Sequence, residues 1–141
     1  MRKWDDRLLG MASVVATWSK DPKRRVGAVI ADADNRVVSV GYNGFPRGVG
    51  DSPALLEDSQ QKLLRTLHAE ANALLFAARP VAGCVAYVTY PPCSQCAAML
   101  IQAGITRVVA FHPGEVSSKW AASWEAAEQM MREAGVVLDL R

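Results

Sequence analysis

Two short segments of the sequence combine residue types that bind metals and move protons. They are His68-Ala69-Glu70 and Pro91-Pro92-Cys93-Ser94-Gln95-Cys96. His68, Cys93 and Cys96 would leave the fourth tetrahedral position of a zinc ion open for water, which distinguishes a catalytic zinc site from a structural one. Glu70 lies two residues from His68 and can reach that water without binding the metal. We therefore predict one catalytic Zn²⁺ per chain, with Glu70 as the catalytic residue.

The spacing of the two cysteines supports a metal site at the start of a helix. Cys93 and Cys96 are three residues apart and would share one helix face, where the helix N-terminus stabilises thiolates. Pro92 suits the first turn of a helix, because the backbone N–H that proline lacks would have no hydrogen-bond partner within the helix there. Alone, a C-x-x-C pair is equally compatible with a redox pair or a four-cysteine zinc site. The linked H-x-E argues against a redox pair. A four-ligand structural zinc is disfavoured because the other soft ligands are Cys84, which we expect to be a small core residue, and His112, which we expect to be a loop residue.

The combination H-x-E followed by P-C-x-x-C is the signature of the zinc deaminases that act on nucleobases. Zinc lowers the pKa of its bound water, and the resulting hydroxide attacks the ring carbon that carries the exocyclic amine. Glu70 would take the proton from that water, deliver it to the ring nitrogen and later help to protonate the departing ammonia.

The elements that must hold these segments follow from periodicity. We expect a helix from Trp4 to about Ser19 with Trp4, Leu8, Met11, Val15 and Trp18 on its apolar face, then an antiparallel pair of strands. A long irregular region with one short helix near 55–64 follows. The remainder alternates helix and strand. The expected helices are 68–78, 93–102 and 119–134, and the expected strands are 26–31, 36–40, 84–89, 106–111 and 136–140.

This order predicts an α/β fold. The last three strands are separated by helices, so they should run parallel in a five-stranded mixed sheet with helices on both faces, a three-layer α/β/α sandwich. Ligands of such sheets bind outside the carboxyl ends of the strands. The length of 141 residues favours a single domain, 1–141.

Composition and charge exclude several classes of protein. The formal net charge is only +2, with 16 Lys plus Arg against 14 Asp plus Glu, so we expect no nucleic-acid partner. No apolar run approaches the roughly 20 residues that span a bilayer, so we expect no membrane partner. Acidic residues near the N-terminus argue against a signal peptide, and the cytoplasm is the expected location.

Beyond the metal signature, the chain resembles the deoxycytidylate deaminases of the cytidine deaminase-like superfamily. The segments that carry the resemblance are Ser19-Lys20-Asp21-Pro22, Val26 to Ile30, Gly41-Tyr42-Asn43-Gly44-Phe45-Pro46-Arg47-Gly48, His68 to Glu70 and Pro91 to Ala97. The resemblance implies the cytidine deaminase type of sandwich and zinc-dependent hydrolysis of dCMP to dUMP and ammonia, which would supply dUMP for thymidylate synthesis. The alternatives are a deaminase of dCTP or of a modified dCMP, and a catalytically silent zinc-containing nucleotide-binding module.

The resemblance also implies a set of substrate contacts. Asn43 would bind the deoxyribose, Val26 and Ala28 would line the base pocket, and Tyr90 would stack on the ring or sugar. The backbone near Ala69 and Pro92 would contact the base. Arg and Lys suit phosphate oxygens, and the candidates Lys20, Lys23, Arg24 and Arg25 precede the first strand, with Lys20 and Arg25 taken as the binding pair.

Regulation and assembly are expected only from the resemblance. The segment containing Gly41, Tyr42, Asn43, Gly44 and Arg47 is similar to the part of the family that binds dCTP or dTTP as allosteric effectors, with Mg²⁺, in a homohexamer. Trp120 and Trp124 lie four apart beyond the resembling region. We expect this pair to pack in the core or at a subunit interface rather than against substrate.

Overall fold

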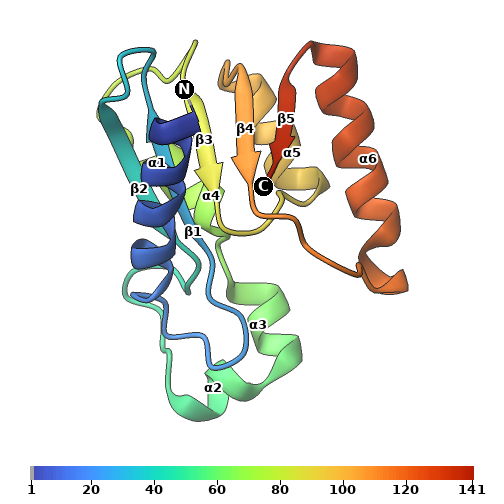
Figure 1. The fold of residues 1–141 in the computed structure, drawn as a ribbon. Coiled ribbons are helices and arrows are strands. Elements are labelled where there is room, and N and C mark those ends of the chain that lie inside the picture. Colours follow the sequence, from blue (N-terminus) through green and yellow to red (C-terminus); the bar gives the residue numbers. More distant parts are fainter. Residues whose placement is uncertain (1) are drawn as a thin grey trace.

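The computed structural model describes residues 2–141, and a mixed β-sheet forms the centre of this part of the chain (Figure 1). The strands are β1 (Gly27–Ala31), β2 (Val37–Tyr42), β3 (Val85–Val88), β4 (Arg107–Ala110) and β5 (Val137–Leu140). The helices are α1 (Arg2–Ala16), α2 (Pro53–Glu57), α3 (Ser59–Arg65), α4 (Ala69–Phe76), α5 (Ser94–Gln102) and α6 (Ser118–Ala134).

The sheet has the strand order β2-β1-β3-β4-β5. β1 is antiparallel to both β2 and β3, whereas β3, β4 and β5 run parallel, as predicted from the helices that separate them. The β1–β2 hairpin closes around Asp32, whose Oδ1 accepts the N–H groups of Asp34 and Arg36. Asn35 adopts a left-handed conformation there, with φ of 63°.

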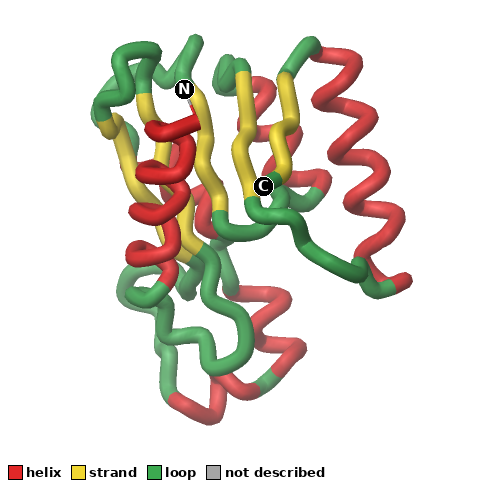
Figure 2. Tube along the Cα trace, in the orientation of Figure 1, coloured by secondary structure: helices red, strands yellow, loops and turns green. Residues whose placement is uncertain are grey.

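Helices cover both faces of the sheet, which confirms the three-layer sandwich (Figures 1 and 2). α1 packs on one face, where Leu8, Leu9 and Val15 meet Val29 and Val109. α4, α5 and α6 cover the other face, and the larger core cluster lies there. No helix within residues 2–141 is long and apolar enough to cross a membrane.

The buried face of α1 differs from the predicted one. Leu8 and Val15 are buried, but Trp4, Met11 and Trp18 are more than a third exposed, so this part of the prediction was wrong. The helix instead buries Asp5 and Ala12, and it ends at Ala16 rather than near Ser19. Small residues let its backbone approach Gly27 of β1 closely, and that contact has no room for a tryptophan.

The helix predicted near 55–64 is in fact two helices. Asp58 has an extended backbone, with φ of −80° and ψ of 109°, and it separates α2 from α3. Its carboxylate accepts the N–H groups of Gln60 and Gln61 and so caps α3. Neither helix contains a buried residue, and both lie beyond the end of the sheet towards which β3 and β4 point (Figure 1).

Candidate active site

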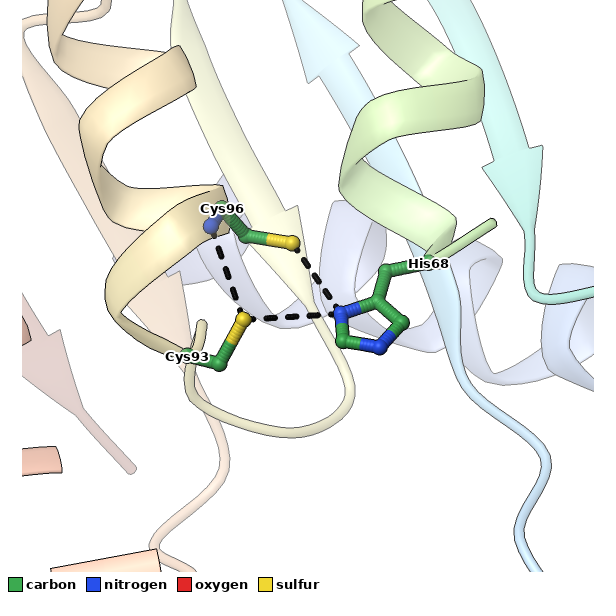
Figure 3. A group of neighbouring side chains, drawn as sticks. All are labelled: His68, Cys93 and Cys96. Carbon is green, nitrogen blue, oxygen red and sulfur yellow. Dashed lines mark hydrogen bonds between the residues drawn. The ribbon is translucent and has the colours of Figure 1, made fainter. Parts of the chain in front are cut away.

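The predicted metal ligands come together at the carboxyl end of β3. His68 is the N-cap of α4, and Cys93 is the N-cap of α5, so both helices begin at a ligand residue. Figure 3 shows one ring nitrogen of His68 facing the sulfur atoms of both cysteines. His68 Nδ1 lies 3.2 Å from Cys96 Sγ and 3.5 Å from Cys93 Sγ. All three ligand atoms lie within 4.8 Å of one another.

This geometry fits a zinc ion. With Zn–S of about 2.3 Å and Zn–N of about 2.05 Å, a tetrahedral site separates its sulfur and nitrogen ligands by roughly 3.6 Å. The observed nitrogen–sulfur distances of 3.2 and 3.5 Å are close to that value. The three side chains lie at the wall of a cavity, where they would hold the ion and leave one coordination position for a fourth ligand.

The local electrostatics favour a bound cation. A hydrogen bond from the Cys96 thiol, together with one from His68, lowers the pKa of Cys93 to about 4. The reciprocal interaction with Cys93 raises the pKa of Cys96, so the two thiols by themselves share one negative charge. A divalent cation stabilises both thiolates at once, which is the form that binds zinc.

Glu70 lies in the first turn of α4 and is 5% exposed. Burial raises the pKa of its carboxyl to about 7. A carboxyl with a pKa near neutrality can both accept and donate a proton at physiological pH, which is what a general acid–base residue requires. Glu70 also lines the cavity beside His68 and Cys93, so its carboxyl is available to a bound ligand.

The cavity has a volume of about 600 Å³, large enough for a nucleotide. Of the predicted substrate contacts, it is lined by Val26, Asn43, Ala69, Tyr90 and Pro92. Tyr90 also lies under the guanidinium of Arg24, 4.7 Å from the ring centroid.

The structure assigns Asn43 a scaffolding role at the cavity wall. Its Oδ1 accepts the N–H of Val26 at 2.8 Å, and its Nδ2 donates to the carbonyl of Arg24 at 2.9 Å. The hydroxyl of Ser19 donates to its carbonyl. Asn43 therefore fixes the loop before β1, and one N–H of its amide remains for a ligand.

Three predicted substrate contacts do not line the cavity. Ala28 is 1% exposed and packs in the core beneath α4. Lys20 points away and pairs with Asp51 at 2.7 Å, and Arg25 donates its Nε–H to the carbonyl of Asp21. Strand alternation and loop folding direct these three side chains away from the cavity lining, and their contact with the substrate stays a prediction.

The loop folds around Asp21, and that decides which cations face the cavity. The Asp21 carboxylate accepts the N–H groups of Lys23 and Arg24 and an ion pair from Lys62 at 2.9 Å. Burial alone would raise the pKa of Asp21, but these hydrogen bonds outweigh it and the pKa is lowered. Lys23, Arg24 and Lys62 line the cavity as a result.

The residues predicted to bind effectors lie on the side of β2 and α4. Gly41 is buried against α4, and Gly44 pairs with Leu67 through its backbone. Tyr42 meets Trp18 edge-to-face, and Arg47 lies over the ring of Phe76. Asn43 is the one member of this set that also lines the cavity.

Sequence reasoning missed the contribution of α6. Trp120, Ser123 and Trp124 line the cavity, so the expectation that the two tryptophans avoid the substrate site is not supported by their position. The available signal was topological, since α6 begins at the same edge of the sheet as the metal ligands. Cys84 and His112 lie outside the cavity, with Cys84 buried in the core and His112 in a loop, as expected.

Comparison with known proteins agrees with this geometry. Residues 2–112 match the family described as the cytidine and deoxycytidylate deaminase zinc-binding region. An uncharacterized deaminase of Aliivibrio fischeri, from the luxG 3' region, is 47% identical over 95% of this chain and 90% of its own length. Human deoxycytidylate deaminase is 36% identical over 95% of this chain and 77% of its own length.

Solved structures agree at the level of the fold. The dCMP deaminase of cyanophage S-TIM5, in complex with dCMP and dUMP, superposes with a TM-score of 0.78 at 20% identity. The superposition covers 100% of this chain and 98% of that protein. The sheet and its helices are therefore arranged as in a deaminase of the cytidine deaminase type.

Proposed function

This chain belongs to the cytidine and deoxycytidylate deaminase family, and we propose that it hydrolyses dCMP to dUMP and ammonia. The observation that carries the proposal is the cluster of His68, Cys93 and Cys96 beside a buried Glu70, in a cavity with cations around it. The matching family is described as a zinc-binding region, so the proposed cofactor is one Zn²⁺ held by the three ligands. Relatives named deoxycytidylate deaminase support the choice of substrate.

The residues of this chain divide the chemistry among them. When bound, the zinc ion supplies a Lewis acid that makes hydroxide available near neutral pH. Glu70 takes a proton from the attacking water and passes it to the ring nitrogen. It then passes a second proton, from the new hydroxyl group on the ring carbon, to the departing amine, which leaves as ammonia. Ala69, Pro91 and Pro92 line the floor of the cavity and exclude water from the base.

Glu70→Gln tests this assignment. The variant keeps a group of the same size but cannot transfer a proton, so the rate of ammonia release from dCMP should fall at least about 1000-fold. Zinc content, measured by atomic absorption, should stay at one ion per chain. A variant with normal turnover would show that Glu70 is not the proton carrier. A parent chain that prefers cytosine or deoxycytidine to dCMP would refute the nucleotide assignment.

We assign the 5′-phosphate to the cations that the Asp21 loop presents. The guanidinium of Arg24 lies over the Tyr90 ring, and its N–H groups can donate to phosphate oxygens. Lys23 lines the same part of the cavity. Lys62 is already paired with Asp21, which fixes its position beside that loop.

Arg24→Gln separates phosphate recognition from catalysis. Loss of one charge-assisted contact should raise the KM for dCMP about 10- to 100-fold, with little change for deoxycytidine, which has no phosphate. Lys20→Gln is the matched control, because Lys20 pairs with Asp51 outside the cavity. Equal effects of the two substitutions would overturn the assignment.

The remaining features stay proposals. A single domain spanning 1–141, a homohexamer, a cytoplasmic location and regulation by dCTP and dTTP with Mg²⁺ follow from the sequence and its resemblance. The exposed segment around Tyr42 and Arg47, away from the cavity, is where effectors would bind. The retained Glu70 favours an active enzyme over a silent nucleotide-binding module.

A further inference from the structure

The first turns of α6 line the cavity although the sequence offered no role for them there. We propose that Trp120 and Trp124 form an aromatic wall that contacts the bound nucleotide and selects a flat base. This inference rests on the proposed function and identifies part of its specificity. The two residues lie four apart, so they share one face of α6, and both line the cavity.

Hydrogen bonds fix this face of α6 against the metal-binding turn. The hydroxyl of Ser123 accepts the backbone N–H of Ser94 at 2.9 Å, and it lies 3.2 Å from the hydroxyl of Ser94. Ser94 directly follows Cys93, one of the metal ligands. Ser123 and Trp124 both line the cavity, so this contact holds the stretch of α6 that carries Trp124 against the start of α5.

Trp120 lies one helical turn closer to the start of α6. Its neighbours along the cavity are Lys119 and Val116, which precede it in sequence. The Nζ of Lys119 lies 5.8 Å from the centroid of the Trp120 ring. This order places Trp124 at the level of the base and Trp120 farther out, at the level of the sugar and phosphate.

The exposure of the pair is consistent with a ligand-contacting surface. Trp120 is 36% exposed and Trp124 is half-buried, although both lie at the wall of a cavity in the molecule. Aromatic side chains that keep one face free inside a cavity are suited to stacking on a base, since every base has a π-face. Tyr90 also lines the cavity, but the guanidinium of Arg24 lies over its ring, 4.7 Å from the centroid.

Steady-state kinetics of substituted chains test the wall. Trp124→Leu keeps an apolar side chain but removes the π-face, so the KM for dCMP should rise about 5- to 100-fold while kcat changes much less. Trp124→Phe should recover most of that loss, because a π-face is restored. A merely structural role would lower kcat and stability together and would not be rescued in KM.

The four tryptophans of the chain allow a direct readout of contact. Trp4 and Trp18 precede β1 and do not line the cavity. In a Glu70→Gln background, which prevents turnover, the tryptophan fluorescence of a chain carrying Trp4→Phe and Trp18→Phe comes only from Trp120 and Trp124. In the complementary chain, which carries Trp120→Phe and Trp124→Phe, the fluorescence comes only from Trp4 and Trp18.

We expect dCMP to quench the fluorescence of the first chain and to leave that of the second unchanged. Two results would refute the aromatic wall without refuting the proposed function. One is quenching confined to the second chain, and the other is an unchanged KM in Trp124→Leu with normal turnover by the parent chain. If equilibrium dialysis shows that the parent chain does not bind dCMP and it does not turn dCMP over, the proposed function fails, and the wall fails with it.

Discussion

Gly41 offers the sharpest test of how the fold positions the site. It lies in β2, directly beneath the first turns of α4, which begins immediately after His68 and contains Glu70. A Cβ at position 41 would lie 2.5 Å from the carbonyl oxygen of Ala69 and closer still to the backbone nitrogen of Ala73. Ordinary van der Waals contact begins at 3.4 Å. Gly41→Ala therefore forces α4 away from the sheet by about 1 Å.

The magnitude of the effect follows from that displacement. Overpacking of this kind costs about 1–3 kcal/mol in the free energy of unfolding, because the contacts are backbone atoms that cannot rotate away. A displacement near 1 Å of catalytic groups costs about 100-fold in rate. We expect both losses in Gly41→Ala, since Ala69 lies between His68 and Glu70.

Urea unfolding and kcat/KM for dCMP measure the two effects. Gly10→Ala is the matched control, because Gly10 lies in α1 with nothing within 4 Å of its added Cβ. There the same substitution should stabilise the protein by up to about 1 kcal/mol, since alanine favours helix, and should not change the rate. A Gly41→Ala chain with wild-type stability and wild-type kcat/KM would refute the close-approach argument.

Two further predictions concern the ion-pair network that joins α1 to the last two strands. The Asp5 carboxylate is 3% exposed and pairs with Arg107 and Arg141. Asp5→Asn should lower the free energy of unfolding by about 3 kcal/mol, because both guanidinium groups lose their buried charged partner and keep the more exposed carboxylate of Asp139. Urea unfolding at pH 7 measures this, and a loss below about 0.5 kcal/mol would contradict it. Hydrogen bonds from Arg141 and then Arg107 lower the pKa of Asp139 to about 2, and a hydrogen bond from Arg107 lowers that of Asp5. These depressed pKa values stabilise the fold above pH about 4, and that contribution should be lost as pH falls towards 2, since the unfolded chain then binds more protons. Unfolding free energies that do not change between pH 4 and 2 would contradict this assignment.

The fold could be predicted to a large extent from local patterns. Alternation of helix and strand fixed the number of strands and the parallel direction of β3, β4 and β5, and turn residues such as Gly135 marked the end of α6 correctly. The periodicity of α1 was less informative. Its tryptophans suggested a buried face, yet the sheet accepts the side that carries Asp5 and Ala12, because Arg107 neutralises the first and close packing requires the second.

The functional site, like the fold, could be predicted from the sequence only in part. Cys93 and Cys96 were recognisable because residues three apart at the start of a helix share one face. His68 and Glu70 were recognisable because they lie two apart in a motif that leads into a helix. The phosphate contacts were not recognisable. Which of four neighbouring cations faces the cavity depends on the hydrogen bonds of Asp21 within its loop, and composition carries no information on them.

The sequence by itself determined the chemistry of this protein, since three ligands and one carboxylate at fixed spacing define a zinc-deaminase centre. Only the tertiary structure decided what surrounds that centre. The loop around Asp21 selects Lys23 and Arg24 over Lys20 and Arg25, and the Ser123–Ser94 hydrogen bonds bring Trp120 and Trp124 to the cavity. The physical reason is distance along the chain. Backbone geometry decides how residues two or three apart are placed. Contacts such as Ser94–Ser123, 29 residues apart, and Asp21–Lys62, 41 residues apart, depend on how whole elements pack.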